Sequence, residues 1–548
     1  MTRSPAHTQA ATAFDTLAAD FFSVWFRFHP DLAVEAGISG FSRLLPTQDD
    51  DEQAALAGWL ESLIVALEEI DFDALDPDRQ IDLELMFAAA RVEHCELHQR
   101  DWRQRDPLRF LPSGEIYRLT LLPPQDLRGA LVDVLSGIPQ HLRLAQTRLV
   151  ASAHRVGPEL AAAAIDEAEK GRCYLRELAH SSWLRKHCHG WSQLDSLTDE
   201  ACSALSGFAE ILRQDVAPRA AGPLGCGPKH LRLLLRHRHF MDFDPMAGCA
   251  ALNLALAETE GHLDELCAEL GIAPHEAPRR LDAVAVDGRT RLESYHVECE
   301  RLHGTLKRTG LVTLPAVPLH ISERPDCPRP HRFGADYVPA WDDERSGTLF
   351  LASQDPGIEV PPDALARVRG RCLSRTWGGA HLLTFAGGET ARRPPRRLAG
   401  GSSLTRGWDL YLRERLGAGE GYGASPEERL HGLLHRRALI LTAQLDLALH
   451  TGQITGTELH RHLAADPGSD PARVVALAQA PGDALAGVLG WCMIREARRL
   501  MEQWQGSGFS ERGFHDRLVG HGPIPVPLIL RHELGADFWD QVRGAVLG

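Results

Sequence analysis

The sequence predicts a mainly α-helical protein that contains one small β-sheet. Three observations support this fold class. Apolar side chains recur at helical spacing through most of the chain, as in residues 11–30, where they fall at i, i+3 and i+4. Between about 310 and 355 the pattern changes to short apolar runs separated by prolines, which is typical of strands. From residue 406 to the end the helical pattern returns.

The first half of the chain, residues 1–309, is predicted to be helical throughout. Prolines and other turn residues separate its helical stretches, and Pro124 opens one of them, since proline is well tolerated in the first turn of a helix. The predicted helices after the first occupy residues 51–71, 77–100, 124–152, 157–180, 196–217, 245–271 and 276–309.

The second half, residues 310–548, begins with the predicted sheet. Residues 311–315 and 348–352 are its clearest strands, because each is a short apolar run bounded by turn residues. Residues 385–403 are rich in glycine, arginine and proline, and we expect them to form a mobile surface segment.

The composition is that of an ordinary globular protein, with 44% hydrophobic and 24% charged residues. The net charge of −15 argues against a nucleic-acid partner, which would require a basic surface. The N-terminus lacks the apolar region of a signal peptide, and no apolar run reaches the roughly 18 residues that span a bilayer. Scattered cysteines without a CxxC pair indicate a reducing compartment. We therefore expect a cytoplasmic protein with no nucleic-acid or membrane partner.

Two stretches carry the most information about function. Residues 374–381 read SRTWGGAH and residues 406–411 read RGWDLY. Further segments that occur with them in a fixed order are residues 14–18 (FDTLA), 29–33 (HPDLA), 37–40 (GISG), 105–108 (RDPL), 337–339 (YVP), 481–482 (PG) and 514–516 (FHD), together with Asp446 and His450.

On these segments the chain resembles, over nearly its full length, the bacterial domain of unknown function 885 family. That family looks like helical zinc metallopeptidases of the carboxypeptidase and oligopeptidase type. The resemblance implies a metallopeptidase-like fold of long helices around a deep cleft. Residues 1–309 would cover the cleft, and residues 310–548 would carry the small sheet and the site.

The chemical signature of the family reads His-Glu-x-x-Pro-Gly-His-His, followed downstream by Glu-Gly-Trp. The resemblance implies the mechanism of zincins, in which imidazoles and a carboxylate hold zinc and the glutamate activates the bound water. The matching positions of this chain are, in order, Ser374, Arg375, Ala380, His381 and Arg406, and a further family tyrosine falls at Gly487.

These replacements remove the chemistry that the resemblance would otherwise imply. Ser374 has a hydroxyl where the family has an imidazole. Arg375 and Arg406 have permanently charged guanidiniums where the family has carboxylates. Two guanidiniums would repel a dication, and the single remaining histidine cannot supply the three protein ligands of a catalytic zinc. We therefore predict a vestigial site with no catalytic residue, no metal ligand and no cofactor.

The two arginines suggest a cleft that binds an acidic group instead. Guanidiniums suit carboxylates through paired donors, so the expected partner is a peptide or another carboxylate-bearing ligand. Tyr411, His450 and His515, which lie in the matched segments, complete the predicted ligand-binding set with Arg375 and Arg406. The competing interpretation is that the two arginines pair with the nearby acids Asp409, Glu389 or Glu414.

Two classes of function follow. The first is a non-catalytic relative of a zinc metallopeptidase, whose cleft binds a peptide, an acidic ligand or a partner protein. The alternative is an active metallopeptidase or other hydrolase with an unrecognised ligand set. Under that alternative zinc would be the cofactor, held by His431 and His435, which lie one helical turn apart, together with His450 and His381. A Ser374–His381 nucleophile pair is not expected, because seven helical residues span about 10 Å.

Overall fold

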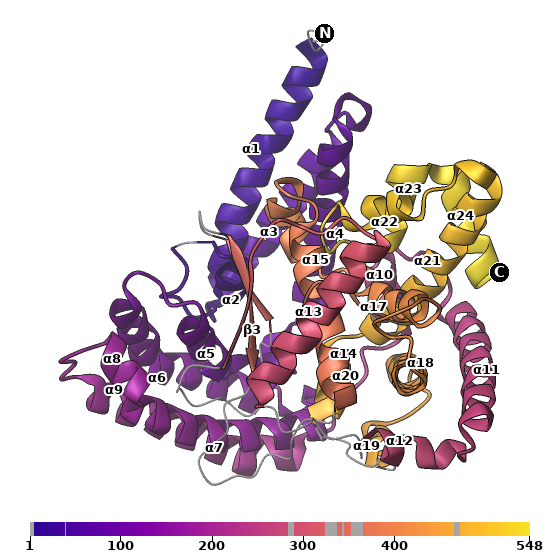
Figure 1. Cartoon of the computed structure of the whole chain (residues 1–548). Helices are drawn as coiled ribbons and strands as arrows, with labels where there is room; N and C mark the ends of the chain where they lie inside the picture. Colours follow the sequence, from indigo (N-terminus) through magenta and orange to yellow (C-terminus); the bar gives the residue numbers. More distant parts are fainter. Residues whose placement is uncertain are drawn as a thin grey trace.

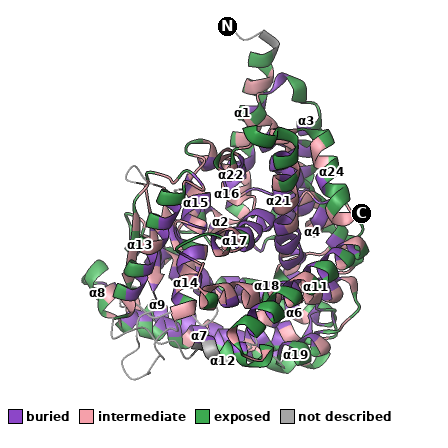
Figure 2. Cartoon of the chain, turned by 45° about the vertical axis from the view of Figure 1, so that its right-hand side comes forward, coloured by how far each residue is buried: buried purple, intermediate pink, exposed green. Residues whose placement is uncertain are grey.

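The structure, a computed structural model, is mainly helical and contains one three-stranded sheet, as the sequence predicts (Figure 1). It describes residues 5–38, 40–282, 290–323, 337–341, 345–351, 365–464 and 472–548. Buried residues gather on inner helices such as α17 (Ser402–Gly417), whereas outer helices such as α8 (Ser182–His187) are largely exposed (Figure 2).

The helices before the sheet follow the apolar periodicity of the sequence closely. An exception is the predicted helix 276–309. It is divided between α12 (Ala277–Asp282) and α13 (Arg291–Thr309), and residues 283–289 lie outside the described part. Thr290 and Glu293 form a capping box at the start of α13, and Gly310 ends the helix with φ +59°. The remaining helices of this half are α1 (Pro5–Phe28), α2 (Pro30–Glu35), α3 (Asp50–Glu68), α4 (Pro77–Gln99), α5 (Ser113–Leu121), α6 (Leu127–Ala151), α7 (Pro158–His180), α9 (Leu194–Ile211), α10 (Pro228–His237) and α11 (Pro245–Leu270).

The sheet lies within the predicted region and beside α13 (Figure 1). Its strands are β1 (Leu319–Glu323), β2 (Tyr337–Ala340) and β3 (Ser346–Leu351), in the order β1–β3–β2. The central strand β3 pairs in parallel with β1 and in antiparallel with β2. The predicted strand 348–352 therefore matches β3, apart from residue 352, which lies outside the described residues.

The predicted strand at residues 311–315 is wrong, because this segment is irregular. Its polar groups bind a distant helix in place of a neighbouring strand. Both the backbone nitrogen and the hydroxyl of Thr313 donate to the carboxylate of Asp516 at 2.7 Å, and the carbonyl oxygen of Leu311 lies 2.8 Å from His515 Nδ1. The apolar run packs its side chains inward without joining the sheet.

The helices of the second half enclose the largest part of the core. Two of them, α17 and α21, pack so closely that glycine is required on both. A Cβ on Gly490 would lie 2.0 Å from the carbonyl oxygen of Ser403, and one on Gly407 would lie 2.7 Å from the backbone nitrogen of Trp491. The other helices are α14 (Leu365–Arg375), α15 (Ala380–Phe385), α16 (Pro394–Leu398), α18 (Pro426–Thr451), α19 (Gly456–Ala464), α20 (Ala472–Gln479), α21 (Asp483–Gln505), α22 (Glu511–Val519), α23 (Val526–Leu534) and α24 (Ala536–Leu547).

The division into residues 1–309 and 310–548 stays a prediction. The largest apolar cluster of the core draws on both parts, with Leu252 and Leu302 from the first and Trp408 and Trp491 from the second. In the described part of the chain no single helix is long and apolar enough to cross a bilayer. Only α20 and α21 taken together, with a 73° bend between them, reach that length and apolarity.

Residues 385–403 are folded, so the expectation of a mobile surface segment is wrong. They contain α16, and the Arg396 side chain is fully buried there. Its guanidinium donates to Asp82 and Asp78 of α4, each at 2.8 Å. Burial raises the pKa of Asp82, although the charges of Arg396 and Arg393 oppose this effect. The arginine that suggested a surface segment thus joins the two parts of the chain.

Replacing Arg396 with alanine should destabilise the protein by about 3 kcal/mol, because the buried Asp82 would keep Arg393 as its only cation and Asp78 would lose its partner. Urea unfolding followed by circular dichroism would measure the loss. The control is Arg392→Ala, which removes an ion pair to the exposed Glu389 and should change the free energy of unfolding very little. Equal effects of the two substitutions would contradict the role of Arg396.

Candidate functional site

Ser374, at the position of the first signature histidine, is held inside a hydrogen-bond network. It lies in the last turn of α14, facing α17. Its hydroxyl is 2.7 Å from Asp409 Oδ1 and 2.9 Å from the carbonyl oxygen of Gly370, and it accepts from Arg413 Nη2 at 2.9 Å. The hydrogen-bonding capacity of this hydroxyl is therefore already used within the protein.

Asp409 forms the centre of this network. Arg413 Nε donates to Asp409 Oδ2 at 2.9 Å, and His435 Nε2 lies 3.2 Å from the same oxygen. Burial would raise the pKa of Asp409, but Arg413 and His435 outweigh burial and hold it well below its usual range. The carboxylate stays ionised and paired, so it is not available to Arg375 or Arg406.

Arg375 and Arg406 are both exposed, and within the described ranges neither forms an ion pair. The three acids considered as their partners bind other cations. Asp409 binds Arg413, Glu389 binds Arg345 and Arg392, and Glu414 lies near Arg436 and Arg495. The Arg406 side chain packs over Gly487. A Cβ added at Gly487 would lie 2.8 Å from the Cβ of Arg406.

His381, the one signature histidine that remains, is fully buried. Its Nδ1 lies 3.0 Å from the Tyr337 hydroxyl and its Nε2 lies 3.0 Å from the carbonyl oxygen of Val317. Gly347 permits this contact, because a Cβ there would be 2.5 Å from His381 Nδ1. Burial lowers the pKa of His381 to about 4. The imidazole therefore joins α15 to the sheet.

The other predicted ligand-binding residues are buried and bound to the protein itself. Tyr411 and His515 lie 2.7 Å apart, from the phenol oxygen to Nε2. His450 accepts from the backbone nitrogen of Cys226 at its Nδ1, 3.0 Å away, and its Nε2 lies 3.0 Å from the carbonyl oxygen of Leu477. The structure brings Tyr411 and His515 together, whereas His450 contacts the loop at Cys226.

The residues at the signature positions do not fit a zinc ion. Ser374 and His381 are engaged in internal hydrogen bonds, and Ala380 has no donor atom. His431 and His435 stack with ring centroids 6.4 Å apart, but both nitrogens of His450 are used elsewhere. In the ranges that the structure describes, no group of three or more His, Cys, Asp or Glu side chains is arranged to hold a metal.

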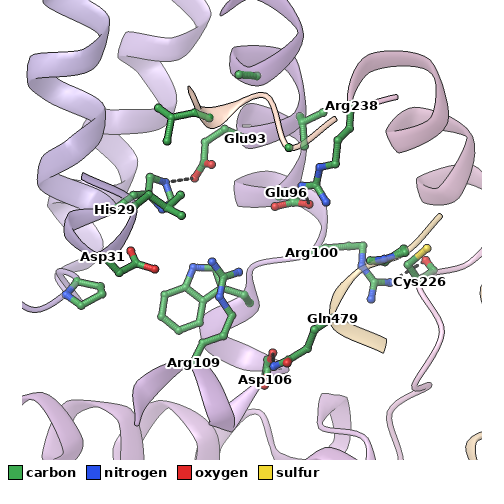
Figure 3. Close-up of a pocket in the computed structure, with 18 of the residues that line it drawn as sticks. His29, Asp31, Glu93, Glu96, Arg100, Asp106, Arg109, Cys226, Arg238 and Gln479 are labelled. Carbon is green, nitrogen blue, oxygen red and sulfur yellow. Dashed lines mark hydrogen bonds and ion pairs between the residues drawn. The ribbon is translucent and has the colours of Figure 1, made fainter. Parts of the chain in front are cut away.

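A large cavity of about 780 Å³ lies elsewhere, among α1, α2, α4, α10 and α20 (Figure 3). One part of its wall is apolar, with Phe21, Trp25, Leu85, Met86 and Leu160. None of the predicted vestigial or ligand-binding residues lines it, namely Ser374, Arg375, His381, Arg406, Tyr411, His450, Gly487 and His515. The matched segments of the sequence could have indicated this cavity, because members of residues 29–33 and 105–108, together with Pro481, contribute to its wall.

Several charged side chains of the cavity wall are paired. His29 faces Glu93 across 3.2 Å, as Figure 3 shows, and this acid raises the pKa of His29 against the opposing effect of burial. Glu96 lies 3.4 Å from His230 and 3.7 Å from Arg238. Burial would raise the pKa of Glu96, but the hydrogen bond with His230 and the charge of Arg238 lower it to about 2. These pairs are structural parts of the wall.

A family model described as "Bacterial protein of unknown function (DUF885)" matches residues 30–532. The chain belongs to this family. No curated protein matches the chain at a significant level. The fold of this DUF885 member is similar to that of a putative lipoprotein of unknown function from Shewanella oneidensis, with a TM-score of 0.74, 17% identity and coverage of 95% of this chain and 99% of the other. A putative lipoprotein from Colwellia psychrerythraea gives a TM-score of 0.77, 16% identity and coverage of 98% and 100%.

Replacing Asp409 with asparagine should cost about 3–5 kcal/mol of stability at neutral pH, because Arg413 would lose its buried partner. The depressed pKa of Asp409 stabilises the folded protein above the unfolded carboxyl pKa of about 3.9. The difference between wild type and variant should therefore be full above about pH 5 and shrink as the pH falls below about 4. Urea unfolding at several pH values measures this difference, with Glu420→Gln on the surface as the control. A difference that grows on acidification would contradict the pairing.

Proposed function

We propose that this DUF885 member is a non-catalytic relative of helical zinc metallopeptidases, and that it binds a peptide or another carboxylate-bearing ligand in its large cavity. The observation that carries the proposal is the engagement of Ser374 by Asp409 and Arg413. A metal at the signature position would have to compete with this buried ion pair. The metallopeptidase-like character itself rests on the resemblance of the matched segments.

The cavity supports the binding part of this proposal. Its volume of about 780 Å³ lies in the range of small-molecule and cofactor sites, about 300–1,000 Å³. Aromatic and aliphatic side chains of α1 and α4 form one part of the wall, and charged side chains form another. An amphipathic ligand such as a short peptide matches this division, because its apolar side chains and its charged ends need different surroundings.

The compartment forms part of the same proposal. The scattered cysteines favour the cytoplasm, whereas the two structural neighbours, described as putative lipoproteins, favour a location outside it. We propose the cell envelope for this chain on the basis of these neighbours. Fractionation of cells that express the native gene tests this point, and recovery in the cytosolic fraction alone would contradict it.

The purified, untagged protein should contain far less than one zinc ion per chain, even after incubation with zinc. The reason is that the signature positions offer a bound hydroxyl, a buried imidazole with both nitrogens used, and two exposed cations. Elemental mass spectrometry measures the content. One zinc per chain would favour the alternative, an active metallopeptidase or other hydrolase with an unrecognised ligand set.

Random hexapeptides incubated with the protein should be retained on ultrafiltration and recovered with unchanged masses. Ala89, an exposed cavity-wall residue of α4, offers a way to block the site. Ala89→Trp should abolish retention, because the indole would occupy the cavity. The matched control is Ala162→Trp, at an exposed position of α7 outside the cavity wall. Shortened peptides would favour the hydrolase, and retention by the Ala89 variant would place binding elsewhere.

A further inference from the structure

Three arginines of the cavity wall, Arg100, Arg105 and Arg155, form no ion pair with a carboxylate among the described residues. Arg100 Nη1 donates to the carbonyl oxygen of Cys226 at 2.8 Å, and Arg155 donates to the side-chain oxygen of Gln104. Arg105 forms no ion pair in this part of the chain. Each of these arginines therefore has guanidinium donors directed at no acid.

By contrast, two other arginines that line the same cavity are neutralised by acids. Arg118 lies 3.3 Å from Glu35 and 3.8 Å from Asp31. Arg238 lies 3.7 Å from Glu96. The cavity wall thus contains arginines that are paired with acids and three that are not, and of these three Figure 3 labels Arg100, which lies next to Cys226.

The positive charges of these three arginines repel one another. Burial lowers the pKa of Arg105, and the charges of Arg100 and Arg155 lower it further. Like charges in a partly buried wall destabilise one another unless an anion lies between them. Arg100 and Arg105 are partly buried, whereas Arg155 is exposed and more strongly screened, so a bound oxyanion would stabilise the protein mainly through the first two.

The scaffold around this cluster is fixed by close backbone contacts. The nitrogen of Gly222 donates to the carbonyl oxygen of Val156 at 2.9 Å, and a Cβ on Gly222 would lie 2.0 Å from the carbonyl oxygen of Arg155. A few residues further along, the backbone nitrogen of Cys226 donates to His450. His450 thus holds the loop whose carbonyl oxygen accepts from Arg100, and acts as a positioning residue for the cluster.

We infer that Arg100, Arg105 and Arg155 form an oxyanion subsite that binds the carboxylate of a ligand held in the cavity. This inference rests on the proposed function, in which the cavity binds a ligand without cleaving it. Guanidiniums bind carboxylates and phosphates through paired donors. Leu160 and Leu224, which also line this cavity, give the body of the ligand an apolar surface, as the residue next to a peptide C-terminus would need.

Two mixtures of random hexapeptides, one with free C-terminal carboxylates and one with C-terminal amides, test the subsite. Wild type should retain the acids roughly tenfold to a hundredfold better, the range of a charged hydrogen bond. Arg105→Ala should remove this preference and leave retention of the amides unchanged. The matched control is Arg118→Gln, a cavity arginine already paired with acids, which should keep the preference for acids.

Inorganic phosphate is the second probe and separates the two sources of an oxyanion. Phosphate binding that depends on Arg105, without a preference for peptide acids, would support the subsite and assign it to a phosphoryl group. Equal retention of acids and amides, with no phosphate binding that depends on Arg105, would overturn the subsite while the proposed function stands. If no peptide is retained but phosphate binding depends on Arg105, the proposed function fails and the subsite stands.

Discussion

The close contact between α17 and α21 fixes the relative position of two core helices in the second half of the chain. Gly407 and Gly490 allow the two backbones to touch, and any side chain on Gly490 would collide with the carbonyl oxygen of Ser403. With this contact fixed, successive residues of α17 reach different neighbours. Asp409 faces Ser374 on α14, and Tyr411 faces His515 on α22. Helix α17 thus supplies the groups around Ser374 and His515, whereas Tyr337 and Val317 surround His381.

The charges at the signature positions and in the cavity follow different rules. At Ser374 every strong donor or acceptor has an internal partner, and Asp409 is bound by both Arg413 and His435. A buried ion pair of this kind stabilises the fold only while both partners remain. The cluster at Arg105 has no such internal compensation. Ser374 and Asp409 are therefore occupied by internal contacts, whereas the cavity arginines keep donors that a ligand can use.

The sequence predicts the helices well, because their apolar periodicity is a local property. It fails where a residue binds a partner far along the chain. Residues 311–315 have the composition of a strand, but Thr313 binds Asp516. Arg396 lies in a segment rich in glycine and proline, yet it binds Asp82 of α4. The cavity is missed for the same reason, because the matched segments at 29–33 and 105–108 converge only in the folded chain.

The acidity of the whole protein does not oppose an anion-binding cavity. The net charge of −15 is spread over 548 residues, and surface charges are screened beyond about 8 Å at physiological ionic strength. Inside the cavity the nearest charges determine the electrostatic energy of a bound anion. Screening there is weaker because less water is present. The guanidiniums of Arg100, Arg105 and Arg155 line the same wall and act on one another. The negative surface would therefore slow the approach of an anion, while the local cluster determines whether it stays bound.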